Sequence, residues 1–296
     1  MAMPINEFAA SRERMSEQWR GRRERGSKSL VRLIIWLALR CGRALCRILL
    51  LPICAYFLVT APLARQSSLA FLSRALNRRA TWRDTFVHLF VFATTLLDRV
   101  YLVNGRQREL TVEMNNEPAF WQALAQGRGC LLLGSHLGSF EMLSIIGSVE
   151  KKLTINVVMQ MANSQGLRDL MVSPGHELPY NVIPLGHPGS MLSVQECLAR
   201  GEVVGILADR VYGGERTQSL PFLGRPARFS LSPLRLAKIT GAPVLMVFGL
   251  FHGGRRYEIA FESMAELTLP CYVENLERQA RRFPYNWFNF YDYWSI

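Results

Sequence analysis

The sequence has 296 residues, 49% of them hydrophobic, which is enough for one large domain with an additional anchoring segment. The formal net charge is +12, and residues 1–65 carry +8 of it, with 12 Lys/Arg against 4 Asp/Glu. Aromatic readout motifs are not interleaved with these charges and an apolar segment follows them, so membrane attachment is favoured over nucleic-acid binding. The six cysteines show no metal-ligand spacing, which argues against structural zinc and indicates a reducing compartment.

The apolar segment covers residues 30–64, and its second half, residues 48–64, contains 17 uncharged residues. A spanning helix needs about 20 residues. A tilted span, a re-entrant segment and an interfacial helix therefore all remain open, as does a helix buried in the core. The preceding basic residues place the N-terminus in the cytoplasm if the segment spans. We expect a basic, membrane-anchoring part over residues 1–64 and an α/β domain over residues 65–296.

Hydrophobic periodicity predicts helices over residues 67–79, 82–97 and 120–125. Strands and helices alternate after that point. The expected strands are residues 131–133, 154–159, 181–184, 203–208, 244–251 and 257–261. The expected helices between them end near residue 147 or cover residues 167–171, 189–199 and 231–239. This alternation indicates an α/β sandwich and not a helical bundle.

The first predicted strand ends in Gly-Ser-His136, and Glu141 follows five residues after the histidine. Positions five apart point about 140° away from each other on a continuous helix. The two side chains meet only if His136 lies in a strand-to-helix loop and Glu141 lies in the first turns of the next helix. In that arrangement Glu141 holds one ring nitrogen and leaves the other free as a base. The alternative is a hydrogen-bonded structural histidine beside a solvated acid.

Asp209 follows the apolar strand predicted over residues 203–208. It either caps a turn or positions an acceptor, or an arginine, near His136. Several arginines surround the loop after it, a pattern that suits phosphate or another anion, or a solvated basic face. These arginines are Arg210, Arg216, Arg225 and Arg228.

The C-terminal segment, residues 283–294, contains eight aromatic residues in twelve positions. An exposed tail would not tolerate this density. The segment therefore packs on the core or lies at a membrane interface, where Trp and Tyr are favoured. Core packing is the preferred interpretation.

The block over residues 129–141 resembles the H-x4-D/E signature of membrane-associated acyltransferases. It is most similar to the late acyltransferases of bacterial lipid A biosynthesis, which usually carry Glu at the last position. Glycerol-phosphate acyltransferases usually show Asn and Asp where this chain has Ser135 and Glu141. Three further stretches match the lipid A group, and the similarity runs from about residue 19 to residue 294. They are residues 163–171, which include Arg168, residues 205–210 with 221–227, and residues 236–245.

The resemblance implies a glycerol-phosphate-acyltransferase-like fold, with a mixed sheet between helices, and an O-acyltransferase that requires no metal or cofactor. A fatty-acyl chain would pass directly from an acyl thioester, expected on acyl carrier protein, to a hydroxyl of a lipid or glycolipid such as lipid A of lipopolysaccharide. His136 and Glu141 would be catalytic, and backbone N–H groups near residues 134–138 would stabilise the oxyanion. Arg168, Asp209 and Arg210 would bind substrate. The site would face the cytoplasm at a bacterial inner membrane.

The chain also departs from that family. Lipid A enzymes commonly carry Asp-Gln where this chain has Asp209-Arg210. Residues 19–27 and 284–294 resemble a subgroup associated with aryl-polyene or xanthomonadin pigment clusters, which leaves the acceptor open. A lipid esterase or thioesterase and a non-catalytic membrane-attached interaction protein remain alternatives. A serine hydrolase is disfavoured, because Ser135 and Ser139 adjoin the histidine without a G-x-S-x-G elbow.

Overall fold

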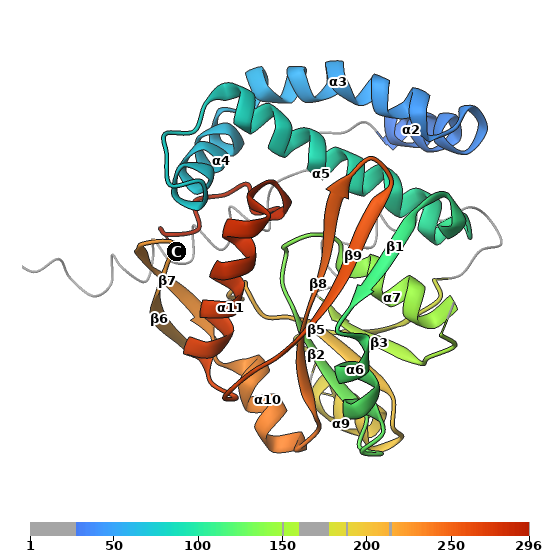
Figure 1. Ribbon diagram of the computed structural model, residues 1–296, viewed down its shortest axis with the longest axis vertical. Coiled ribbons are helices and arrows are strands. Elements are labelled where there is room, and N and C mark those ends of the chain that lie inside the picture. Colours follow the sequence, from blue (N-terminus) through green and yellow to red (C-terminus); the bar gives the residue numbers. More distant parts are fainter. Residues whose placement is uncertain (1–27, 150, 160–177, 188, 213–214, 296) are drawn as a thin grey trace, which may run out of the picture.

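A seven-stranded sheet lies at the centre of the computed structural model, which describes residues 28–149, 151–159, 178–187, 189–212 and 215–295 (Figure 1). The strands follow the order β1-β9-β8-β2-β5-β3-β4, and every neighbouring pair is parallel except the antiparallel β8–β9 hairpin. The predicted mixed sheet is therefore confirmed. The strands are β1 (Thr111–Asn115), β2 (Cys130–Gly134), β3 (Ile155–Met159), β4 (Asn181–Pro184), β5 (Val203–Leu207), β8 (Val244–Gly253) and β9 (Arg256–Ser263).

Helices cover both faces of this sheet, as the predicted sandwich requires (Figure 1). Strand β2 shows how the two cores are separated. Leu131 and Leu133 join one core while Cys130 and Leu132 join the other, because successive strand side chains point to opposite faces. One face carries α5 (Trp82–Val103), α6 (Glu117–Leu124) and α7 (Phe140–Val149). The other carries α4 (Pro62–Ala75), α9 (Ser190–Ala199), α10 (Ser232–Thr240) and α11 (Leu269–Arg282).

Most predicted strands and helices beyond residue 120 match an observed element, and the strand predicted over residues 181–184 coincides with β4. The helix predicted over residues 167–171 lies outside the described residues. The sequence did not predict β1, α11 or the small hairpin of β6 (Thr217–Phe222) and β7 (Arg225–Ser230). Strand β1 lies at the sheet edge and alternates exposed with half-buried residues, so it has no apolar run to reveal it.

Two helices at the N-terminal end, α2 (Lys28–Cys41) and α3 (Arg43–Thr60), pack against α5 (Figure 1). By length and composition, α3 and α5 are apolar enough to cross a membrane. Half of the apolar 18-residue stretch of α5 is buried within the protein, whereas only 22% of the corresponding stretch of α3 is buried. Helix α3 is therefore the stronger candidate for membrane attachment. The expected boundary between an anchoring part, residues 1–64, and an α/β domain, residues 65–296, stays a prediction.

A buried ion pair fixes α3 on α5. Arg43 Nε and Nη2 donate to the two carboxylate oxygens of Asp98 at 2.5 and 2.7 Å. Tyr257 on β9 donates to the same carboxylate at 2.7 Å. The Arg43 and Asp98 side chains are 3% and 1% exposed, and removing one partner of such a buried pair costs about 3–5 kcal/mol. The pair therefore ties α3 both to α5 and to the sheet.

The loop after β2 passes unusually close to β8. Ser139 N donates to the Gly249 carbonyl at 2.8 Å, and Gly138 has a φ of +82°. A Cβ atom on Gly249 would lie 2.2 Å from the Ser139 carbonyl oxygen, and one on Gly138 would lie 2.1 Å from the Gly249 carbonyl oxygen. Only glycine fits at both positions, so this approach fixes the course of the loop that carries His136.

The variant Gly249→Ala should lose about 3 kcal/mol of unfolding free energy, because the added Cβ displaces the facing backbone. The matched control is Gly189→Ala, since a Cβ at Gly189 meets nothing within 4 Å and its φ is −84°. The control should change the unfolding free energy by no more than about 0.5 kcal/mol. Denaturant unfolding of the purified proteins in detergent measures both values, and equal stability of the two variants would contradict the close approach.

Candidate active site

The parallel pairing of β2 with β5 brings His136 and Asp209 together. Gly134 is in register with Leu207, and each site residue lies two positions beyond its strand at the same edge of the sheet. His136 Nδ1 lies 2.8 Å from Asp209 Oδ1, and the His136 amide donates to Oδ2 at 3.0 Å. With the proton on Nδ1, the imidazole donates to the carboxylate and Nε2 carries the lone pair.

The Asp209 carboxylate is completely buried and accepts hydrogen bonds from the C-terminal segment. Trp287 Nε1 donates to Oδ2 at 3.3 Å and Asn289 Nδ2 donates to the same oxygen at 3.1 Å. The Tyr293 hydroxyl donates to the Asp209 main-chain carbonyl. Trp287 and Tyr293 are both buried, so the predicted packing of the aromatic segment on the core is confirmed. Donors on every side stabilise Asp209 as an anion.

The same segment also holds the main chain of His136 in place. The Phe288 amide donates to the His136 carbonyl at 2.8 Å. On the other side of the segment, Nε2 of the buried His88 lies 3.0 Å from the Trp287 carbonyl. Burial lowers the pKa of His88 to about 4, so this ring is neutral near pH 7 and supports the segment as a hydrogen-bonding group.

Glu141 lies in the first turn of α7 and His136 in the loop before it, as the spacing predicts. The Glu141 carboxylate, however, forms an ion pair with Arg99 on α5, with Oε1 and Nη2 2.7 Å apart. The expectation that Glu141 holds a ring nitrogen is therefore wrong, because Nδ1 bonds Asp209 and no described residue makes a hydrogen bond to Nε2. Helix α5 packs against α7, and its arginine draws Glu141 away from the ring.

Charges around the imidazole set its protonation state. Burial lowers the pKa of His136 and the nearby Arg210 guanidinium lowers it further, while Asp209 and Glu141 act in the opposite direction. The net pKa lies below the ordinary value of 6.5. Burial alone would raise the pKa of Asp209, but the attraction to His136 holds it well below its usual range. At neutral pH a neutral imidazole, 21% exposed, therefore faces an ionised carboxylate, which is the state of a general base.

Arg210 follows Asp209 directly and turns back onto the C-terminal segment. Its Nε donates to Asn289 Oδ1 at 2.8 Å, and its Nη2 donates to the Phe288 carbonyl at 3.3 Å. The guanidinium also lies over the Tyr291 ring, 5.6 Å from the centroid. The structure thus brings Arg210 to the site, whereas Arg168 lies outside the described residues and its role stays a prediction.

Sequence reasoning missed the site roles of Trp287, Asn289 and Arg99. The density of aromatic residues indicated that the C-terminal segment is buried, but it did not indicate which carboxylate the segment contacts. Asn289 and Arg99 belong to no motif, and they reach the site only because distant parts of the chain pack together.

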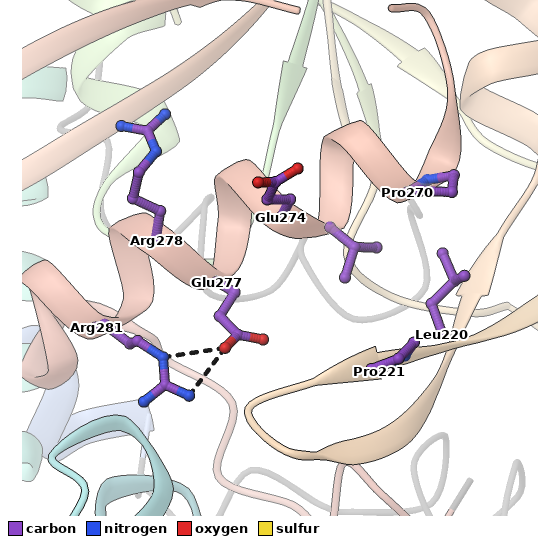
Figure 2. Close-up of a pocket in the computed structure, with 8 residues that line it drawn as sticks. Leu220, Pro221, Pro270, Glu274, Glu277, Arg278 and Arg281 are labelled. Carbon is purple, nitrogen blue, oxygen red and sulfur yellow. Dashed lines mark hydrogen bonds and ion pairs between the residues drawn. The ribbon is translucent and has the colours of Figure 1, made fainter.

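A cavity of about 520 Å³ lies elsewhere, between α11 and the β6–β7 hairpin (Figure 2). At its wall, Arg281 pairs with Glu277, whose other carboxylate oxygen accepts a hydrogen bond from the Leu223 amide at 2.6 Å. These charges therefore stabilise the contact between α11 and the hairpin. Within the described part of the chain, no group of three or more His, Cys, Asp or Glu side chains is placed to hold a metal ion.

A sequence model for the bacterial lipid A biosynthesis acyltransferases matches residues 76–280, which include His136, Glu141 and Asp209. The chain belongs to this family. A similar protein is the phosphatidylinositol mannoside acyltransferase of Mycobacterium tuberculosis (strain ATCC 25618 / H37Rv), which is 28% identical over 133 residues. That match covers 44% of this chain and 42% of the mycobacterial protein, so the chain spans less than half the length of this relative. The predicted family resemblance is confirmed, and the pigment-associated subgroup stays a prediction.

The surrounding charges predict opposite pKa shifts for two variants of this site. Asp209→Asn should lower the pKa of His136 further, because it removes a charge that raises this pKa and leaves the burial unchanged. Arg210→Gln should raise the pKa of His136, because it removes a charge that lowers it. Titration of the His136 ring by NMR in detergent micelles measures both pKa shifts. Arg235→Gln on α10 is the control, since it removes the same charge as Arg210→Gln. Shifts of the same sign in Asp209→Asn and Arg210→Gln would overturn this description.

Proposed function

We propose that this protein is an O-acyltransferase that moves a fatty-acyl chain from an acyl thioester on acyl carrier protein to a hydroxyl of a lipid or glycolipid. The observation that carries the proposal is the neutral His136, held through Nδ1 by a buried carboxylate, with Nε2 unbonded to any described residue. Family membership supports acyl transfer as the reaction class. The mycobacterial relative is named for acyl transfer to a phosphatidylinositol mannoside, which supports a lipid acceptor.

The proposed reaction is a direct transfer without a covalent enzyme intermediate. His136 Nε2 removes the proton from the acceptor hydroxyl, and the oxygen attacks the thioester carbonyl. The tetrahedral intermediate then collapses, the carbon–sulfur bond breaks, and the imidazolium returns the proton to the leaving thiolate. A positioned general base contributes roughly 10²–10⁴-fold to such a reaction. The ionised Asp209 stabilises the imidazolium and keeps Nε2 directed at the acceptor.

Glu141 is assigned a supporting role in this reaction. Its carboxylate raises the pKa of His136 through space while it remains paired with Arg99. A charge in that position stabilises the imidazolium as it forms, without a hydrogen bond to the ring. Glu141 therefore assists the base electrostatically, and Asp209 orients it.

The oxyanion and the substrate require donors beyond the loop after β2. The amides of His136, Leu137 and Gly138 already donate to acceptors within the protein, so the expected oxyanion site near residues 134–138 is not free to form from these three. We assign the anionic groups of the substrate to Arg210 and, on the family resemblance, to Arg168. The sequence predicted that Asp209 binds substrate. Because Asp209 is fully buried, we assign it the positioning of His136 instead.

We place the enzyme at the cytoplasmic face of a bacterial inner membrane. The exposed apolar side of α3 and the net charge of +12 support attachment to an anionic membrane. A lipid acceptor and a carrier-protein donor meet at such a surface. Lipid A and a lipid linked to aryl-polyene pigments are the acceptor candidates that the sequence resemblances indicate.

Acyl transfer by the detergent-purified protein tests the proposal. The purified protein is incubated with radiolabelled acyl-acyl carrier protein and a total lipid extract from Gram-negative bacteria. The labelled products are separated, and their masses are measured by mass spectrometry. The wild type should produce a labelled lipid whose mass identifies the acceptor. His136→Ala should lower the rate at least about 100-fold, because the general base is lost.

The matched control is His187→Gln, which changes an exposed histidine in the turn after β4 and should retain wild-type activity. Label recovered only as free fatty acid would indicate a thioesterase or esterase. Labelled lipid formed equally by wild type and His136→Ala would rule out His136 as the base. Absence of turnover from acyl-acyl carrier protein and from acyl-coenzyme A, with folded protein, would favour the non-catalytic interaction protein.

A further inference from the structure

A second cavity, of about 470 Å³, lies where α3 meets α5 and the turn between β8 and β9. Its lining is both basic and apolar. Three arginines line it: Arg43, which is paired with Asp98, and Arg47 and Arg255. Ile48, Leu51 and Phe90 contribute apolar surface. The proposed acyl transfer does not use this cavity, since none of its lining residues contacts His136 or Asp209.

Arg47 is held in this cavity with unsatisfied hydrogen-bonding capacity. Its Nε is buried and has no hydrogen-bond partner, and its guanidinium lies over the Phe90 ring at 5.4 Å from the centroid. The carboxylate that acts on Arg47, Asp98, is already hydrogen-bonded by Arg43 and Tyr257. Arg47 forms no ion pair with a described residue, and a buried positive charge without a partner is destabilising. An anionic ligand in the cavity would compensate this charge.

Arg255 supplies a second cation from a different part of the chain. It is exposed in the β8–β9 turn and forms no ion pair with a described residue. No acidic residue lines the cavity. Residues 28–75 contain seven Lys/Arg and no Asp or Glu, so the surrounding helices reinforce the positive field.

Two apolar residues of the lining also belong to the exposed surface of α3. Ile48 and Leu51 line the cavity and are 61% and 42% exposed. Further along the helix, Tyr56 and Val59 are exposed in the same way. A row of exposed apolar side chains next to an unsatisfied arginine matches a ligand with an anionic head and a hydrocarbon tail.

We propose that this cavity binds an anionic phospholipid of the membrane, with its phosphate on Arg47 and Arg255 and its acyl chains along Ile48 and Leu51. Arg47 is then at the level of the lipid headgroups, which is where a charged residue of a membrane-attached helix is tolerated. The Arg43–Asp98 pair keeps α3 on the surface of the domain. Helix α3 then lies in the membrane interface.

Vesicle binding of the full-length protein tests this site. Co-sedimentation is measured with vesicles of phosphatidylglycerol and phosphatidylcholine, and with vesicles of phosphatidylcholine alone. Each arginine on a phosphate should contribute about fivefold to binding of the anionic vesicles. The double variant Arg47→Gln/Arg255→Gln should lose at least about tenfold there and should bind pure phosphatidylcholine like the wild type.

The matched control is Arg235→Gln, on α10 at the opposite end of the molecule from α3 (Figure 1). It removes one charge and should change binding less than about twofold. A loss in Arg235→Gln equal to that in Arg255→Gln would show general electrostatic attraction and overturn the site. The single variant Arg255→Gln changes an exposed turn, so it keeps the test valid if changing Arg47 impairs folding. It should lower binding to the anionic vesicles about fivefold.

A second measurement distinguishes a lipid from a free anion. Dihexanoylphosphatidylglycerol and inorganic phosphate are each titrated into detergent-solubilised protein by calorimetry. The short-chain lipid should bind the wild type at least about tenfold more tightly than phosphate does. Ile48→Ser should lower the affinity for the lipid and leave the affinity for phosphate unchanged. Equal affinity for the two ligands, or unchanged lipid affinity in the double variant, would overturn the proposal.

Discussion

The buried carboxylate of Asp209 is the constraint that organises this protein. A carboxylate taken out of water is stable only where donors or positive charges surround it. Here the His136 amide and ring, the Trp287 indole and the Asn289 amide supply them. Two of these donors belong to the loop after β2 and two to the end of the chain, more than 140 residues later. Satisfying one buried charge therefore closes the C-terminal segment over the sheet edge and fixes the imidazole in the same step.

The two carboxylates near the imidazole make different contacts because their surroundings differ. Asp209 is sealed in and bonds the ring, whereas Glu141 is partly exposed and is paired with an arginine of another helix. Arg210 opposes the two carboxylates and helps keep the pKa of His136 below its ordinary value. A proton accepted by the ring is stabilised by both acids, and the resting ring is neutral. Both features support the proposed role of His136 as a general base.

The sequence predicted the elements that have strong periodicity or buried apolar runs, including β2, β4, β5 and α7, and it placed His136 and Glu141 correctly on a loop and a helix. It assigned the wrong partner to His136, because spacing along one segment reports local geometry alone. The register of β2 with β5 places Asp209 opposite His136, and that register comes from packing across the sheet. Arg99, Trp287 and Asn289 act through contacts between distant segments, which no local pattern encodes. The edge strand β1 lacked a comparable signal. Helix α11 has apolar residues at helical spacing, including Leu269, Tyr272 and Leu276, so its pattern was present in the sequence and was overlooked.

The role of Asp209 is tested most directly by the protonation of the two His136 ring nitrogens, measured by ¹⁵N NMR of selectively labelled protein at neutral pH. We expect a neutral ring with the proton on Nδ1 in the wild type and in Glu141→Gln, since Nδ1 donates its hydrogen bond to Asp209 in both. Asp209→Asn should lose this preference for Nδ1, because the neutral amide no longer selects one tautomer. A ring that keeps its Nδ1 proton in Asp209→Asn and loses it in Glu141→Gln would contradict the assignment of Asp209 as the group that orients the base.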